Sequence, residues 1–187
     1  MKQQLFTALR LTGVCILVFS IGYPLLILLV AQLAPGQGQG QTLSANGRVV
    51  GYALEGQSFT SDRYFWGRPS AAGYQADASA ASNKGPANPS YLQEVQNRID
   101  TFLIHNPGVK TSQIPADLVT ASASGLDPDI SVEAAEVQVD RIAKKRGIPV
   151  KQVVDLVNKE TERPLFGVLG TTRVNVLKLN LALDALK

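Results

Sequence analysis

Hydrophobic side chains are concentrated near the start of the chain, where residues 11–33 (LTGVCILVFSIGYPLLILLVAQL) carry no charge. At roughly 1.5 Å per helical residue, a run of about 23 residues exceeds the hydrocarbon thickness of a bilayer, about 30 Å. The pattern therefore predicts one transmembrane helix at residues 11–33, preceded by a short segment at residues 1–10. The rest of the chain mixes polar and apolar positions and predicts a single globular domain.

A flexible tether is predicted at residues 34–47 (APGQGQGQTLSANG), because Gly, Gln and Pro cannot bury enough apolar surface to fold alone. Residues 48–187 are predicted to form a mixed α/β (α+β) domain. Its expected elements are a strand at 48–54, an extended piece at 56–62, a loop at 64–90, helices at 89–106, 131–146 and 149–158, a strand at 117–120 and a helix from 175. The last element also alternates in the manner of a strand, so both periods remain open there.

Small residues recur along the predicted membrane helix. At 100° per residue, Gly13, Ser20, Pro24 and Ala31 fall within about 20° of one line on the helix surface. Such a strip lets another helix approach closely, which predicts a membrane-helix packing surface. The alternatives are a chance alignment of residues that are common in spans, and a Pro24 that only kinks the helix.

The distribution of positive charge predicts the orientation of the chain. Lys2 and Arg10 precede the span and no Lys or Arg follows until Arg48, so the N-terminus is expected in the cytoplasm and the domain on the periplasmic side. The apolar run is longer than the roughly 7–15 residues of a cleavable signal peptide, which is the alternative. The chain is thus expected to be a single-pass protein of a bacterial inner membrane, and its one cysteine, Cys15, lies within the span.

Charge and motif content exclude several function classes. The net charge is +3, and without Lys2 and Arg10 the 18 basic side chains become 16 against 15 acidic ones, so no nucleic-acid footprint remains. No phosphate-binding GxxxxGK[ST] run occurs, and the single histidine, His105, cannot build a multi-histidine metal site. We predict no catalytic and no metal-binding residues. Asp127 and Asp129 could bind a cation, although DPD before a helix favours a turn.

Two candidate partner or ligand segments remain. An aromatic triplet flanked by arginines has the composition of a protein-binding hot spot, although alternation could instead bury its central residue in the core. A second segment combines Asn, Gly and Pro in a rigid polar loop. The candidate residues are Tyr64, Phe65, Trp66, Arg68, Asn83, Gly85 and Asn88.

The order of these segments resembles the C subunit of the Kdp-type potassium-transporting P-type ATPase, the KdpC family. The resemblance covers essentially the whole chain. It rests on the short basic N-terminus with one span, then RVVGYALEGQSF, YFWGRPSAAGY, ASNKGPANP, IPADLVTASASGLDPDIS, QVDRIAKKRGI and RVNVLKLNLALD. The segment SVEAAEVQV and the Gln-Gly tether depart from the family pattern.

The resemblance implies a non-catalytic accessory subunit of a high-affinity, ATP-driven potassium uptake complex. Its partners would be a channel-like potassium-binding subunit and an ATP-hydrolysing P-type subunit, whose ATP affinity it would raise as a catalytic chaperone. No cofactor of its own is implied; ATP would act through the ATPase subunit, and K+ is the transported ion. The alternative from the residues alone is a free-standing, membrane-tethered periplasmic binding domain or enzyme that uses the loop at residues 82–90.

Overall fold

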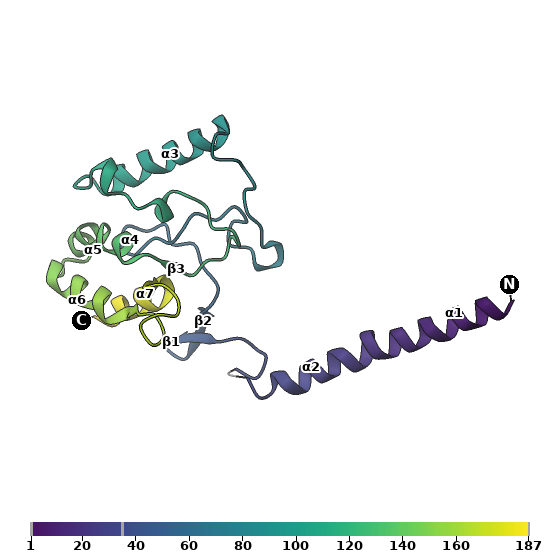
Figure 1. Ribbon diagram of the computed structural model, residues 1–187. Helices are drawn as coiled ribbons and strands as arrows, with labels where there is room; N and C mark the ends of the chain where they lie inside the picture. Colours follow the sequence, from purple (N-terminus) through teal and green to yellow (C-terminus); the bar gives the residue numbers. More distant parts are fainter. Residues whose placement is uncertain (1, 35, 187) are drawn as a thin grey trace. The chain divides into compact units, whose positions relative to one another are not determined.

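The computed structural model describes residues 2–34 and 36–186, which divide into two compact units, one ending at Thr42 and the other beginning at Leu43. The first unit is a continuous helix made of α1 (Lys2–Cys15), the π-helical η1 (Ile16–Gly22) and α2 (Tyr23–Ala31). It is drawn in purple in Figure 1. It has 30 residues, and an 18-residue window within it reaches a mean hydropathy of 2.7, so length and composition allow it to cross a membrane.

This helix is longer at its start than the apolar run that predicts it. The Lys, Gln, Leu and Ala residues before position 11 are good helix formers, so the helix begins at Lys2. None of its side chains is buried. The single long apolar helix followed by a mixed domain confirms the predicted fold class.

The π-helical stretch changes the geometry of the small-residue strip. The N–H of Tyr23 donates to the carbonyl of Val18, five residues back, so each turn of η1 holds an extra residue and each residue turns through less than 100°. The alignment of Gly13 with Pro24, computed for a uniform α-helix, therefore does not hold across η1. Pro24 and Ala31, both in α2, stay within about 20° of each other.

The second unit opens with a two-stranded sheet of β1 (Thr42–Ala45) and β2 (Arg48–Tyr52). The predicted tether at 34–47 is thus wrong over its last residues. The reason lies in the turn: Asn46 and Gly47 both have positive φ, 51° and 75°, as a type I′ hairpin turn requires, and Asn-Gly is its preferred sequence. The strand predicted at 48–54 is confirmed over β2.

A three-stranded antiparallel sheet and four helices form the body of this unit. The sheet order is β3 (Asp129–Ile130), β5 (Arg173–Asn175) and β4 (Thr161–Glu162). Against it pack α4 (Val132–Glu136), α6 (Val150–Glu160) and α7 (Val176–Ala185), and α5 (Val139–Arg146) packs against α6. The inward side chains of these elements, together with Phe65, form the core. Its fully buried members include Phe65, Ile142, Val153, Val157, Val174, Leu179 and Leu183.

Two sequence predictions in this body are wrong. The helix predicted over 131–146 is divided at Val137, because Gln138 tightens the turn and donates from its side chain to the carbonyl of Ala134 at 2.9 Å. The strand predicted at 117–120 is a 3₁₀ turn, η4 (Ala116–Leu118), which Pro115 begins. The C-terminal segment, for which the sequence leaves both a strand and a helix open, contains both. The strand β5 ends at Asn175, and the side chain of Asn175 caps the helix α7 that follows.

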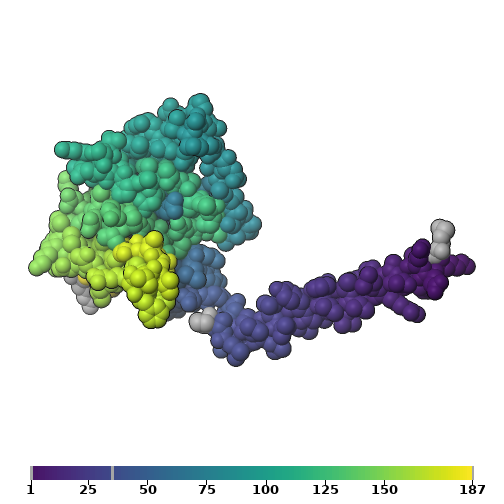
Figure 2. Space-filling model, viewed as in Figure 1, coloured from purple at the N-terminus to yellow at the C-terminus, as the bar shows by residue number. Residues whose placement is uncertain are grey.

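The long helix α3 (Pro89–His105) lies on the side of the domain opposite α6 and α7 (Figures 1 and 2). Asn88 caps its start by accepting from the N–H groups of Ser90 and Tyr91. Most of its predicted core face is used, because Phe102 is buried and Val95 and Ile99 pack half-buried against the core, whereas Leu92 is 52% exposed. Between β2 and α3 the chain forms the predicted long loop, which contains one short 3₁₀ turn, η2 (Ala76–Ala78). Another 3₁₀ turn, η3 (Thr111–Gln113), follows α3.

Candidate functional site

The aromatic triplet lies in an irregular stretch, residues 61–66, which we call the aromatic segment. Asn180 of α7 holds Phe65: the Phe65 N–H donates to Asn180 Oδ1 at 2.8 Å and Asn180 Nδ2 donates to the Phe65 carbonyl at 3.0 Å. Gln138 holds Trp66 in the same way: the Trp66 N–H donates to Gln138 Oε1 at 2.8 Å, and Gln138 Nε2 donates to the Trp66 carbonyl at 3.2 Å. Two side-chain amides therefore satisfy the backbone groups that a neighbouring strand would satisfy in a sheet.

A buried arginine of α5 completes this support. Arg141 Nη1 donates to the carbonyls of Asp62 and Tyr64, at 2.7 and 3.0 Å. Its Nε donates to Asn106 Oδ1 at 3.0 Å and its Nη2 to Gln138 Oε1 at 2.7 Å. Burial lowers the pKa of Arg141 to about 10, while the negative charge of Asp62 acts in the opposite direction. The guanidinium thus remains charged at neutral pH and fixes the aromatic segment to α5.

The three aromatic side chains have different environments. Phe65 is fully buried in the core, which is the alternative that alternation predicts for it. Tyr64 donates its hydroxyl to Asp184 at 3.0 Å, and Arg146 lies over its ring at 4.9 Å while pairing with the same Asp184 at 2.7 Å. Only Trp66 lines an open cavity.

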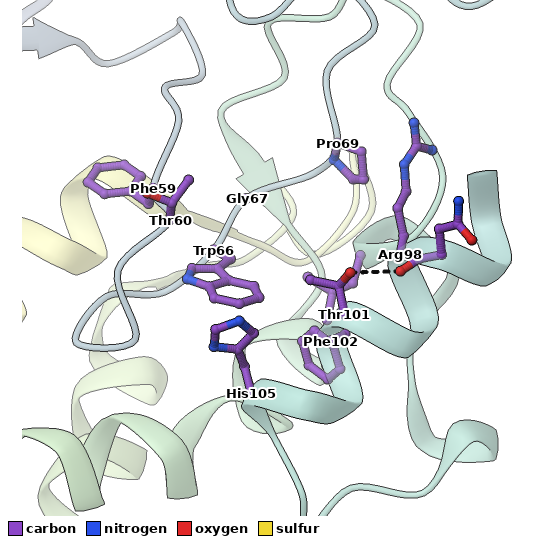
Figure 3. A pocket seen from close by; sticks show the side chains of 11 residues that line it. Phe59, Thr60, Trp66, Gly67, Pro69, Arg98, Thr101, Phe102 and His105 are labelled. Atoms are coloured by element: carbon purple, nitrogen blue, oxygen red, sulfur yellow. Dashed lines mark hydrogen bonds between the residues drawn. The ribbon is translucent and has the colours of Figure 1, made fainter.

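That cavity is a groove of about 410 Å³ between the aromatic segment and α3 (Figure 3). The indole of Trp66 lies between the imidazole of His105, with ring centroids 4.9 Å apart, and Arg141, whose guanidinium carbon is 4.6 Å from the indole centroid. Phe102 meets the indole edge-on at 6.3 Å. The lining residues are Phe59, Thr60, Trp66, Gly67, Pro69, Asn97, Arg98, Thr101, Phe102, His105 and Leu118.

One end of the groove carries a charged cluster. His105 Nδ1 lies 2.6 Å from Asp62 Oδ1, and Lys145 Nζ lies 3.0 Å from Asp62 Oδ2. The hydrogen bond from Lys145, assisted by His105, lowers the pKa of Asp62, while desolvation opposes the shift. His105 thus lies at the end of α3, as its sequence position predicts, and joins that helix to the aromatic segment.

Arg68, the arginine that follows the aromatic triplet, pairs with Asp127 at 2.9 Å. Asp127 also accepts the N–H of Asp129 at 3.0 Å, which gives the DPD sequence the predicted turn. Tyr74 donates its hydroxyl to the carbonyl of Arg68, and burial raises the pKa of that phenol. Arg68 therefore orders the loop beneath the groove and does not line it.

The polar loop residues lie apart from the groove. Asn83 has φ 52° and donates to the carbonyl of Ala81 at 3.2 Å, and Asn88 is the cap of α3. Gly85 is exposed, and no atom lies within 4 Å of the position a Cβ would take there. None of these residues lines the groove, so the structure does not bring the two predicted segments into one site.

The groove has the chemistry of a surface that accepts an apolar or aromatic side chain. Its floor is indole and phenyl, and its rim carries the guanidinium of Arg98 and the imidazole of His105. Within residues 2–34 and 36–186, no group of three His, Cys, Asp or Glu side chains is placed to hold a metal ion. Aromatic rings beside cations are typical of protein-binding hot spots.

Three buried polar residues that hold the segment, Gln138, Arg141 and Asn180, were not among the sequence candidates. Arg141 and Asn180 lie on helix faces that are otherwise apolar, and Gln138 lies at the turn between α4 and α5. A polar side chain at a core position is the signal that could have identified them, because a buried polar group requires a partner.

Comparison with known proteins gives matches along the whole chain. The family model described as KdpC, K+-transporting ATPase, c chain, matches residues 5–185. A protein of Bacteroides fragilis (strain YCH46) called "Potassium-transporting ATPase KdpC subunit" is 53% identical over 188 residues, which cover 99% of this chain and 98% of the relative. Proteins of the same description from Bacteroides thetaiotaomicron and Caldanaerobacter subterraneus subsp. tengcongensis are 51% and 44% identical, over 97% and 98% of this chain and 98% and 95% of their own lengths.

Proposed function

Because the chain belongs to the KdpC family, the c chain of K+-transporting ATPases, we propose that it is the non-catalytic accessory subunit of a high-affinity potassium uptake complex. Its partners are a channel-like potassium-binding subunit and a P-type subunit that hydrolyses ATP. The chain stabilises their assembly and raises the ATP affinity of the ATPase subunit. K+ is the transported ion, and the chain needs no cofactor of its own.

The observation that carries this proposal is the helix from Lys2 to Ala31, in which no side chain is buried. Lipid alone would be satisfied by any apolar surface, whereas small residues let a second helix approach closely, at Gly13 in α1 and, separately, at Ala31 in α2. An ideal Cβ at Gly13 meets no atom within 4 Å, so this position is open to a neighbour. The span is therefore the assembly element of the subunit.

The charge bias around the span supports an extracytoplasmic domain. Lys2 and Arg10 lie before it, and the next basic residue is Arg48. ATP is cytoplasmic, so in this orientation the domain acts on ATP affinity through the conformation of its partners, from the outer mouth of the channel-like subunit. Trp66 and the groove around it are the contact that we propose for that surface.

A second candidate function is a free-standing, membrane-tethered binding domain. The groove favours it, because about 410 Å³ lies in the size range of small-molecule sites. Such a domain would bind its ligand as the isolated full-length chain, without larger subunits.

Co-purification tests the accessory role. Tagged full-length chain from native membranes of potassium-starved cells should bring down two larger membrane proteins and potassium-stimulated ATPase activity. Gly13→Leu should reduce both. Cys15→Leu is the control, since it places the same leucine side chain on the same α-helix about 200° around its surface. A wild-type chain that comes down alone and without ATPase activity would refute the accessory role and favour the second candidate.

The ATP-affinity role has a separate test. The KM for ATP of potassium-stimulated hydrolysis should be higher in membranes whose complex lacks this chain than in membranes that contain it, and full-length chain added back should lower it. An unchanged KM would refute the chaperone role without touching the role in assembly.

A further inference from the structure

The connection between β4 and β5 exposes four large apolar side chains together. Leu165, Phe166, Val168 and Leu169 are 62%, 85%, 79% and 61% exposed, with only Gly167 between them. We call residues 164–170 the apolar loop. Isolated exposed apolar residues are ordinary, but a continuous group of this size marks an interaction surface.

The apolar loop is a built turn. The N–H of Leu165 donates to the carbonyl of Leu169 at 2.9 Å, the N–H of Leu169 donates back at 3.0 Å, and Gly167 donates to Pro164 at 3.0 Å. At its tip Phe166 takes φ 54°, a left-handed conformation that is unfavourable for an aromatic residue. Such strain persists only where the surrounding structure imposes it, and here it presents the phenyl ring to solvent.

The charges around the apolar loop suit an anionic surface. No acidic residue lies between positions 163 and 172, and exposed arginines, Arg163 and Arg173, stand at its two ends. At its base, Arg173 pairs with Asp129 at 3.2 Å and with Glu162 at 3.3 Å, and Lys178 pairs with Glu162 at 2.7 Å. The two carboxylates there are thus neutralised, and Arg163 supplies the positive charge beside the loop. Apolar side chains flanked by basic ones are the pattern of segments that enter the interface of a membrane with anionic lipids.

We propose that the apolar loop inserts into the headgroup region of the bilayer in which the chain is anchored. The ten residues between α2 and β1, positions 32–41, span at most about 36 Å when fully extended, so the domain is held within reach of that bilayer. A protein partner is the less favourable occupant, because a stable interface buries about 800 Å² per partner, more than a single turn supplies.

Tryptophan fluorescence in lipid tests the proposal. Full-length Phe166→Trp is reconstituted into vesicles of phosphatidylethanolamine and phosphatidylglycerol whose acyl chains are brominated near the headgroup, and the emission of the native Trp66, measured in the unsubstituted chain, is subtracted. Ile104→Trp is the matched control, since Ile104 is an apolar residue of the same domain that is 76% exposed. We expect brominated lipid to quench most of the emission of the introduced tryptophan in Phe166→Trp and little of it in Ile104→Trp. Iodide in the buffer should quench Ile104→Trp strongly and Phe166→Trp weakly.

Equal quenching of both variants by iodide, with no quenching of Phe166→Trp by brominated lipid, would overturn the proposal. So would a Phe166→Trp emission that escapes iodide only in the purified complex, because the loop would then bind a protein. A far-UV circular dichroism spectrum equal to that of the unsubstituted chain checks that each variant is folded. The vesicle measurement uses the chain alone, so its result is independent of co-purification with larger subunits, and only the comparison in the purified complex requires them.

Discussion

The amide of Asn180 is expected to be among the most important polar groups for the stability of the domain. Asn180→Ala removes both hydrogen bonds to the backbone of Phe65, at 2.8 and 3.0 Å. Phe65 is 0% and Asn180 2% exposed, so water cannot replace the lost side chain. The substitution leaves one buried N–H and one buried carbonyl without a partner.

The size of the effect follows from those two groups. A buried backbone group without a partner costs about 1–3 kcal/mol, so the free energy of unfolding should fall by about 2–6 kcal/mol. Domains are stable by only about 5–15 kcal/mol in total. With a urea dependence of about 2 kcal/mol per molar, the unfolding midpoint should fall by about 1–3 M.

Urea unfolding of the full-length chain in detergent, followed by Trp66 fluorescence and circular dichroism, measures this change. Asn97→Ala is the control, because Asn97 lies on the exposed face of α3 and accepts only from the side chain of Gln93 at 2.9 Å. Its effect should stay within about 0.5 kcal/mol. If the midpoints of the two variants coincide, the side-chain amide does not secure the aromatic segment.

Two further predictions concern the backbone and pH. Gly56→Ala would place a Cβ 2.4 Å from the carbonyl oxygen of Asp127, so thermal unfolding should show a loss of stability of about 1–3 kcal/mol. The control, Gly85→Ala, has no atom within 4 Å of the added Cβ and should not lose stability. Equal melting temperatures of the two variants would contradict this reasoning. The pKa of Asp62 is lowered by the hydrogen bond from Lys145, so its carboxylate stabilises the fold above the ordinary value of 3.8 and loses that effect as pH falls through the lowered pKa. Asp62→Asn should therefore cost about 0.2–1 kcal/mol at neutral pH, and its urea midpoint should meet that of the wild type in strong acid; a gap that persists there would refute the assignment.

Much of the secondary structure could be predicted because local chemistry decides it. Ser131 and Asn175 cap helices as their residue types favour, and Gly147 takes the left-handed φ of 69° that ends α5. The errors arose where distant contacts or unrecognised turns decide. Gln138 leaves the helical pattern to reach Trp66, and Asn46 with Gly47 turns a supposed tether into a hairpin.

The candidate site was only partly predictable. The sequence identified Trp66 as a potential contact residue, and Trp66 lines the groove. It could not show that α3 supplies the opposite wall through Thr101 and Phe102, because that depends on how a helix packs against a segment far away in the chain. Asn83 does not line the groove, since nearness in sequence does not bring a loop into it.

The way in which the aromatic segment is held determines when it can become ordered. Its partner Asn180 lies 115 residues after Phe65, and Gln138 lies 72 residues after Trp66. During synthesis the segment therefore leaves the ribosome long before either amide exists, and closing such long loops is slow. Tyr64, Phe65 and Trp66 remain accessible on the nascent chain until α7 is made, so the most aromatic stretch of the domain is protected only after every other helix and strand that the structure describes.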